Sequence, residues 1–144
     1  MNVVIMGCGR VGSTVAARLS KEGHAVSIVD TDSFAFSRLP GSFQGRCVVG
    51  SGNDQRILEE VGIREADAFI ALASGDNRNI LASQRAKYVF EVKTVVTRVK
   101  DPERSEIFEE LGLRTFSPTT IGADLAHDAL FSEAAADARN GAGA

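Results

Sequence analysis

Three glycines near the start of the chain, Gly7, Gly9 and Gly12, have the spacing G-x-G-x-x-G and directly follow an apolar run. In this pattern the first glycine permits a tight turn, the second lets the backbone approach a pyrophosphate, and the third lets a helix pack closely on a strand. Phosphate groups then bind free N–H groups at the N-terminus of that helix. The loop Gly7-Cys8-Gly9-Arg10-Val11-Gly12 is therefore predicted to bind the phosphates of a nucleotide.

Asp30 closes the next apolar run, roughly 20 residues beyond the glycine loop, where dinucleotide sites place an acidic residue. A carboxylate there accepts hydrogen bonds from ribose hydroxyls and repels a 2′-phosphate, which favours NAD or a simple adenosine ligand over NADP. The alternative is that Asp30 serves only as a turn or capping residue. Asp32 is open in the same way, because it either faces the adenosine or caps the helix that begins near Ser33.

Arg10 places a cation in the first turn of a predicted helix, where it opposes the helix dipole at a cost on the order of a few tenths of a kcal/mol. A bound anion reverses that sign, and a guanidinium forms charge-assisted hydrogen bonds to a di- or triphosphate. The alternative is a solvated arginine or a partner of Asp30.

The stretch Gly50-Ser51-Gly52-Asn53 admits two interpretations. It is either a small hydrogen-bonding loop against which an adenine ring lies, or a turn in which Asn53 or Asp54 caps the next helix. Cys8 is interpreted as a small residue that fills a tight loop rather than as a nucleophile, because no histidine lies near it in the sequence.

The residues that catalysis needs are missing from the pattern. A dehydrogenase requires a substrate pocket and an acid or base aimed at the reacting carbon, and a chain of 144 residues has no room for a second domain of ordinary size. The Tyr-x-x-x-Lys pair of single-domain dehydrogenases is absent, since Val92 follows Tyr88 at that spacing, and His24 and His127 lie away from the strand ends. No Walker-type, H-E-x-x-H or paired-cysteine motif is present. We expect a protein that binds a nucleotide without reacting it, with no catalytic residue and no metal site; the alternatives are the cofactor-binding domain of an NAD-dependent oxidoreductase and a methyltransferase that uses S-adenosylmethionine.

Alternating strands and helices must position these residues. Six apolar runs bounded by Gly, Asp, Ser or Pro read as strands, at residues 3–6, 25–29, 46–49, 68–72, 94–99 and 114–116. Helical patterns lie between them, including a less clean one over about 77–90, and Asp101-Pro102 and Ser117-Pro118 mark the starts of two later helices. The alternation predicts an α/β fold of Rossmann type, a doubly wound six-stranded parallel sheet of order 3-2-1-4-5-6 with helices on both faces and one further C-terminal helix.

In that topology a binding crevice lies outside the carboxyl ends of the strands. Every candidate residue follows a strand: the glycine loop, then Asp30 to Asp32, then Gly50 to Asn53, then Ala73 to Asn79. We expect one domain over 1–131, and we interpret the Ala/Gly-rich residues 132–144 as a frayed helix end or a boundary of the chain.

The charge pattern excludes some partners. The formal net charge is −3 and no Lys/Arg block stands out, so we expect no nucleic-acid partner. Met1 leads directly into the first strand without a secretory signal, and no apolar run approaches the roughly 20 residues that cross a bilayer. Two cysteines without a framework pattern fit a reducing compartment. The expected location is the cytoplasm, with any membrane link made through a partner.

Further segments carry a family likeness over nearly the whole of residues 1–131. Arginine follows the second glycine, residues 48–54 read V-V-G-S-G-N-D, residues 65–72 read E-A-D-A-F-I-A-L, Asn79 precedes Ile80, and residues 98–102 read R-V-K-D-P. In this order they resemble the nucleotide-binding N-terminal half of the RCK/KTN (TrkA-N) family, the cytosolic regulators of potassium channels and of Trk/Ktr-type potassium transporters.

The resemblance implies a Rossmann domain that binds one adenine nucleotide per subunit, either NAD/NADH or ADP/ATP. It implies a homodimer, often within an octameric ring, at the inner face of the membrane against a potassium transporter or channel subunit that the ring gates by a change of shape. It also implies that Arg10 and Arg98 meet phosphates, Asp30 the ribose, and Asp32 with Ser51 to Asn53 the adenine end. The candidate nucleotide-binding residues are Gly7, Cys8, Gly9, Arg10, Val11, Gly12, Asp30, Thr31, Asp32, Gly50, Ser51, Gly52, Asn53, Ala73, Ser74, Gly75, Asn79 and Arg98.

The helix after Pro118 carries Ile121, Leu125, Ala129 and Leu130 on one stripe. The resemblance implies the family's crossover helix, which packs on a second subunit; the alternative is a last helix that faces the core. Two departures from the family matter. Ser51 replaces a common Asp, which removes one adenine-side contact, and Thr119 stands where many members have Glu, which argues against an ATP-with-cation mode.

Overall fold

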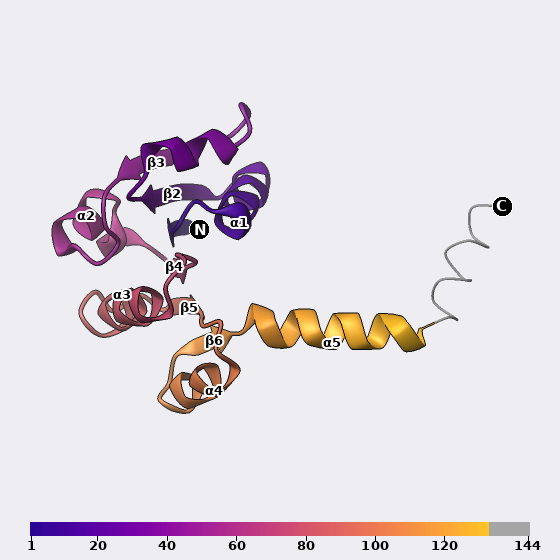
Figure 1. The fold of residues 1–144 in the computed structure, drawn as a ribbon. Coiled ribbons are helices and arrows are strands. Elements are labelled where there is room, and N and C mark those ends of the chain that lie inside the picture. Colours follow the sequence, from indigo (N-terminus) through magenta and orange to yellow (C-terminus); the bar gives the residue numbers. More distant parts are fainter. Residues whose placement is uncertain (133–144) are drawn as a thin grey trace.

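The structure is a computed structural model that describes residues 1–132 (Figure 1). It alternates strands and helices in the order β1 (Asn2–Met6), α1 (Arg10–Lys21), β2 (Ala25–Asp30), a 3-10 helix (Ser33–Arg38), β3 (Arg46–Val49), α2 (Gln55–Glu60), a 3-10 turn (Ile63–Glu65), β4 (Ala68–Ala71), α3 (Asp76–Tyr88), β5 (Thr94–Arg98), α4 (Pro102–Glu110), β6 (Arg114–Phe116) and α5 (Pro118–Phe131). Each observed strand agrees with the predicted run to within one residue at either end.

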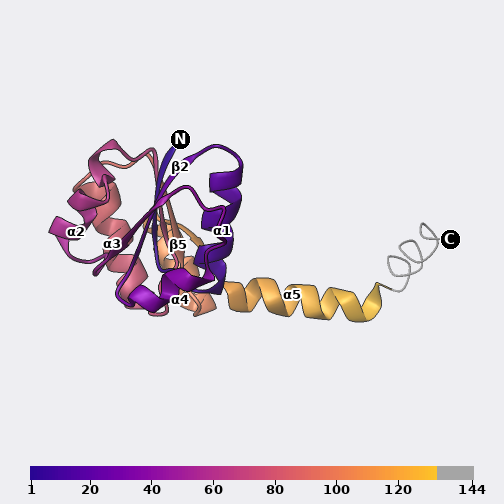
Figure 2. The ribbon, with the colours of Figure 1, turned by 90° about the horizontal axis from the view of Figure 1, so that it is seen from above.

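The strands form one parallel sheet of order β3-β2-β1-β4-β5-β6, which confirms the predicted doubly wound topology. β1 is central, because Val3 pairs with Val26 of β2 on one side and with Ala68 of β4 on the other. Helices cover both faces, with α1 on one side of the sheet and α2 and α3 on the other (Figure 2). This arrangement explains why β1 is a continuous apolar run, since each of its side chains from Val3 to Met6 is buried.

The core is divided into two main layers by the sheet. Alternation along β1 sends Val3 and Ile5 toward α1, and Val4 and Met6 toward α2 and α3. Ile5 and Phe69 are fully buried, and burial of a side chain of this size stabilises the fold by roughly 1.5–3 kcal/mol. These layers hold the strand ends in fixed positions relative to one another.

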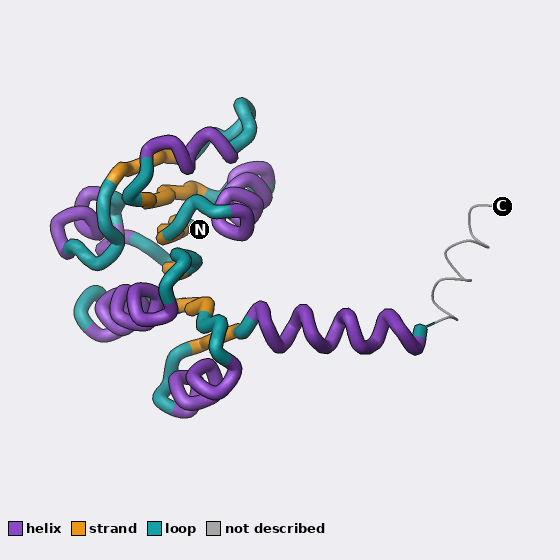
Figure 3. Tube along the Cα trace, viewed as in Figure 1, coloured by secondary structure: helices purple, strands orange, loops and turns teal. Residues whose placement is uncertain are grey.

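Helix starts follow the predicted capping signals. The Asp101 carboxylate accepts a hydrogen bond from the N–H of Glu103 at 3.0 Å, with Pro102 at the first helical position of α4. Ser117 in the same way precedes Pro118 at the start of α5. Each strand is followed by a loop that leads into a helical segment, which after β6 is α5 (Figure 3).

α5 leaves the end of β6 and extends away from the rest of the domain (Figures 1 and 2). None of its residues is buried in this chain. The alternative of a last helix that faces the core is therefore wrong, because the sheet already has helices on both faces and β6 directs the chain outward. The tail prediction for residues beyond Ser132 lies outside the described residues. Among the described helices, none has both the length and the hydropathy that a bilayer crossing needs.

Candidate functional site

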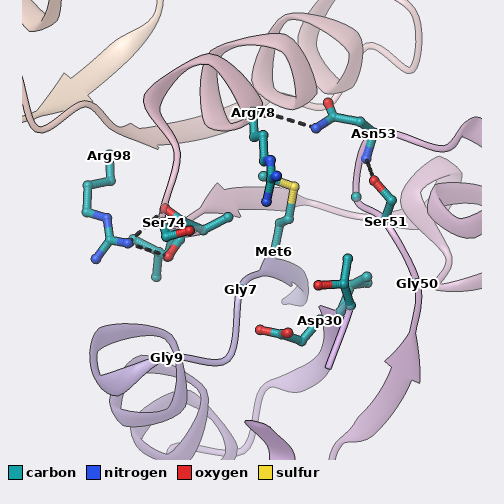
Figure 4. Close-up of a pocket in the computed structure, with 15 residues that line it drawn as sticks. Met6, Gly7, Gly9, Asp30, Gly50, Ser51, Asn53, Ser74, Arg78 and Arg98 are labelled. Carbon is teal, nitrogen blue, oxygen red and sulfur yellow. Dashed lines mark hydrogen bonds between the residues drawn. The ribbon is translucent and has the colours of Figure 1, made fainter. Parts of the chain in front are cut away.

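A cavity of about 480 Å³ lies at the carboxyl ends of β1, β2, β3 and β4 (Figure 4). The predicted site residues that line it are Gly7, Gly9, Asp30, Thr31, Gly50, Ser51, Gly52, Asn53, Ala73, Ser74 and Arg98. Cys8, Arg10, Val11, Gly12, Asp32, Gly75 and Asn79 belong to the same loops and helix starts but do not line it. Met6, Val29, Leu72 and Arg78 line it without having been predicted.

The three motif glycines are required for different reasons. Gly7 has φ of 101°, and a Cβ there would lie 2.7 Å from the backbone nitrogen of Ala73. A Cβ on Gly12 would lie 1.9 Å from the Gly7 carbonyl oxygen, so α1 needs this glycine to pack on the loop. A Cβ on Gly9 would meet no atom within 4 Å. Gly9 therefore leaves open space on the side of the cavity.

Backbone donors for an anion come from the start of α1 and not from Cys8. The Cys8 N–H donates to Asp30 Oδ2 at 2.8 Å, and the Gly7 N–H donates to the Val29 carbonyl at 2.8 Å. The first hydrogen bond within α1 runs from the Ser13 N–H to the carbonyl of the N-cap residue Gly9, at 2.9 Å. The N–H groups of Arg10, Val11 and Gly12 precede it in the first turn, which an α-helix leaves without internal partners and where its dipole is positive.

Asp30 has the structural role that was one of its two interpretations, and its place at the cavity leaves the ribose-binding role a prediction. Its Oδ1 accepts a hydrogen bond from the Asp32 N–H at 2.9 Å and its Oδ2 accepts the bond from Cys8, so the carboxylate orders both loops. Each carboxylate oxygen keeps a further lone pair, and the side chain faces the cavity (Figure 4). Asp30 can therefore hold the loops and still accept hydroxyl donors.

Two neighbouring residues have structural roles. Asp32 Oδ1 accepts a hydrogen bond from the Phe34 N–H at 2.9 Å and caps the 3-10 helix. Cys8 is fully buried, and that burial, reinforced by the charge of Asp30, raises the pKa of its thiol to about 11. The thiol stays protonated at neutral pH, which agrees with its interpretation as a small filling residue.

The loop from Gly50 to Asn53 forms the wall beyond Asp30. A Cβ on Gly52 would lie 2.1 Å from Met6 Sδ, so this loop lies directly on the end of β1. The Asn53 N–H donates to Ser51 Oγ at 3.2 Å, while Asp54 rather than Asn53 caps α2. The Arg85 guanidinium of α3 donates to the Asn53 carbonyl and holds the loop from the other side.

On the β4 side, Asn79 holds two strand ends together. It is fully buried; its Oδ1 accepts from the Ala73 N–H at 2.9 Å, and its Nδ2 donates to the carbonyls of Ala73 at 2.8 Å and Arg98 at 3.1 Å. Its side chain is thus used within the protein. Asn79 positions the wall of the cavity and does not form it.

Arg98 lines the cavity, and part of its guanidinium already forms hydrogen bonds within the protein. Its Nη2 donates to the carbonyls of Leu72 at 2.7 Å and Ala73 at 2.8 Å (Figure 4), while its buried Nε has no partner among the described residues. Burial lowers the pKa of Arg98, against the opposing charge of Asp76.

Sequence comparison identifies relatives for most of the chain. The family model of the TrkA-N domain matches residues 3–118. The Trk system potassium uptake protein TrkA of Streptomyces coelicolor is 48% identical over 124 residues, which cover 86% of this chain and 56% of that protein. The chain spans about half the length of the curated relatives that it matches.

Solved structures share the fold. The C-terminal domain of Kef from Shewanella denitrificans in its AMP-bound form has a TM-score of 0.76 at 22% identity, and the match covers 98% of this chain and 89% of that one. GsuK bound to ADP has a TM-score of 0.75 at 21% identity over 88% of this chain and 33% of that one. At these identities the likeness shows the fold alone.

Proposed function

Because this chain belongs to the TrkA-N domain family, we propose that it is the nucleotide-sensing part of a regulatory subunit for a potassium uptake system or channel. The observation that carries the proposal is the cavity in which Gly9 leaves open space beside the first turn of α1 and Asp30 presents a carboxylate one strand away. Free helix N–H groups and a ribose-binding acid at this separation suit an adenine nucleotide.

The proposed ligand is NAD/NADH or ADP/ATP, one per subunit. The adenine end lies against Gly50 to Asn53, the ribose at Asp30, and the first phosphate on the amides of Arg10 to Gly12. Arg10 is exposed at the first helical position, so its side chain can reach a phosphate there. The bound AMP and ADP of two proteins that share the fold support the same ligand class.

The domain acts as a sensor without catalysis. Within the described part of the chain, the side chains that line the cavity include no histidine, lysine, tyrosine or cysteine. The hydroxyl groups of Thr31, Ser51 and Ser74 line it as well, but among the described residues none of them forms a hydrogen bond to a side-chain base, which a hydroxyl nucleophile needs. Residues 1–131 form the nucleotide-binding domain. It is cytoplasmic, and it reaches the membrane through the potassium transporter or channel subunit that it regulates. Exchange of one ligand for another shifts the equilibrium between two shapes of this assembly. A ligand can change that equilibrium constant by no more than the ratio of its affinities for the two shapes.

α5 is the proposed contact with a second copy of the chain. Its apolar side chains Ile121, Leu125 and Leu130 are 48%, 66% and 76% exposed, which is unfavourable for a helix left alone in water. A partner helix from a second subunit removes this surface from water. A homodimer is therefore the smallest functional unit, and it can assemble further into a ring.

A thermal-shift panel tests the proposal. The chain is melted with adenosine, AMP, ADP, ATP, NAD, NADH and S-adenosylmethionine after any co-purified ligand has been removed and identified by mass spectrometry. A hundredfold excess over Kd stabilises a one-site protein by about 2.7 kcal/mol, so ADP or NAD should raise Tm by several degrees. Stabilisation by S-adenosylmethionine alone, or by none of these compounds, contradicts the proposal.

A further inference from the structure

Arg78 enters the proposed nucleotide cavity from α3, one residue before the motif residue Asn79, and was not itself among the predicted site residues. It lies in the first turn of α3 and lines the main cavity together with Met6, Ser74 and Arg98 (Figure 4). It also lines a shallower neighbouring cavity with Lys100 and Arg104, so the two cavities meet at Ser74 and Arg78.

The backbone and stem of Arg78 are held while its charged end is free. Its carbonyl accepts a hydrogen bond from Asn53 Nδ2 at 3.4 Å, and its Cγ and Cδ pass 3.6 Å from the position of a Cβ on Gly75. No described residue accepts a hydrogen bond or forms an ion pair with its guanidinium, whereas Arg98 already donates to two carbonyls. Arg78 therefore offers a full set of guanidinium donors to a ligand.

The strand order determines which part of a nucleotide meets Arg78. In the proposed pose the ligand follows the strand order of the sheet. Its adenine lies at the end of β3, its ribose at Asp30 of β2, and its first phosphate on the helix that follows β1. The next strand in the sheet is β4, so the group after the first phosphate lies above Ala73 and Ser74. The side chain of Arg78 extends from α3 into the cavity beside Met6, at the end of β1, which neighbours β4 (Figure 4).

We propose that Arg78 is a specificity-determining residue that binds the second phosphate of the ligand and thereby favours ADP and NAD over AMP. The inference rests on the proposed function. Lys100, whose Nζ donates to the Ser74 carbonyl at 2.7 Å, and Arg104, which donates to Asn77 Oδ1 at 2.5 Å, keep the surroundings positive. The nearby Asp76 carboxylate accepts the backbone N–H groups of Lys100 and Asp101. It does not offset the positive charge fully, because the lining of the neighbouring cavity sets this one carboxylate against the three cations Arg78, Lys100 and Arg104.

Isothermal titration of AMP, ADP and NAD into the wild type and three variants tests the proposal. Arg78→Gln keeps much of the aliphatic side chain but removes the charge, and Arg78→Lys restores a positive charge without the planar set of guanidinium donors. Arg18→Gln, on the exposed outer part of α1, is the matched control for loss of one positive charge outside both cavities. Arg78→Gln should weaken ADP and NAD by about tenfold and AMP by less than about twofold, since a hydrogen bond to a charged group corresponds to about this factor. Arg78→Lys should recover part of the loss, and Arg18→Gln should change none of the affinities.

The outcomes separate this inference from the proposed function. Equal weakening of AMP and ADP by Arg78→Gln, or unchanged ADP affinity, overturns the role of Arg78 and leaves nucleotide sensing in place. Wild-type protein that binds none of these three nucleotides, and neither ATP nor NADH in the thermal-shift panel, overturns the proposed function itself. Unchanged melting temperatures of the variants without ligand show that any loss of affinity comes from the site, because Arg78 is exposed and contributes little to the core.

Discussion

At the scale of single residues, Gly9 differs from Gly7 and Gly12, because the fold does not require a glycine at position 9. Gly7 and Gly12 cannot carry a side chain without a backbone clash, so their identity is explained by folding alone. Gly9 has φ of −78° and open space around a Cβ, so the fold would accept another residue there. Because Gly9 also lines the cavity, a glycine there is what we expect if a ligand approaches the backbone closely, as proposed above.

Gly9→Asp is expected to abolish nucleotide binding while the protein stays folded. The new carboxylate would stand beside the first turn of α1, where it replaces the phosphate as the anion and repels it, so affinity for ADP should fall at least tenfold. Titration of ADP measures the loss, and thermal melting measures folding. Gly41→Asp is the matched control, because a Cβ there also meets nothing within 4 Å and the residue lies outside the cavity. ADP affinity that survives Gly9→Asp would show that the phosphate binds elsewhere.

Residues that act through backbone geometry could be predicted from the sequence, and residues that act through distant partners could not. The glycine spacing and Asp30 are local signals, and the structure brings both to one cavity. Asn79 was predicted as a ligand residue, but its partners are carbonyl and amide groups of Ala73 and Arg98. These groups come together only when β4, α3 and β5 pack. Arg78 carried one signal, its place in the first turn after a strand end, and this signal does not tell a site residue from a solvated one.

At the scale of elements, the junction of β4, α3 and β5 is the part of the site that depends most on one side chain. Asn79→Ala removes three hydrogen bonds and leaves buried backbone groups without partners, which should lower the free energy of unfolding by about 2–4 kcal/mol. Urea denaturation measures the change. Asn77→Ala, two residues earlier, loses only one hydrogen bond, from Arg104 at the exposed surface where water can replace it, and should change the free energy of unfolding by less than about 0.5 kcal/mol. If the two variants prove equally stable, Asn79 does not hold the strand ends.

The same junction explains where element boundaries could be predicted. Strands buried on both faces are continuous apolar runs, so their limits agree with the sequence within one residue. α3 was placed at about 77–90 and spans Asp76–Tyr88, because the face it buries includes Asn79 and Ser83 and so has no clean apolar period. The buried Ser83 hydroxyl is not left without a partner, since its Oγ accepts a hydrogen bond from Thr97 Oγ1 of β5 at 2.7 Å.

At the scale of the whole molecule, α5 gives the domain a surface that its own core does not use. The sheet, its covering helices and the cavity at the strand ends are complete before Pro118, where α5 begins and turns outward (Figure 2). The periodic stripe on α5 was visible in the sequence, but the sequence could not decide between the core and a second subunit as its partner. The structure excludes the core of the same chain, since no residue of α5 is buried.

Leu125→Glu should therefore convert a dimer into a monomer without loss of folding. Leu125 is 66% exposed in the single chain, so a glutamate there costs the monomer little, whereas the same charge in a buried apolar contact opposes association strongly. Light scattering coupled to size exclusion measures the mass, and far-ultraviolet circular dichroism measures folding. Ala123→Glu is the matched control, because at 3.6 residues per turn position 123 lies roughly on the opposite side of α5 from Leu125. A wild-type chain that remains monomeric at high concentration, or a Leu125→Glu variant that still dimerises, would mean that this stripe is not where two copies meet.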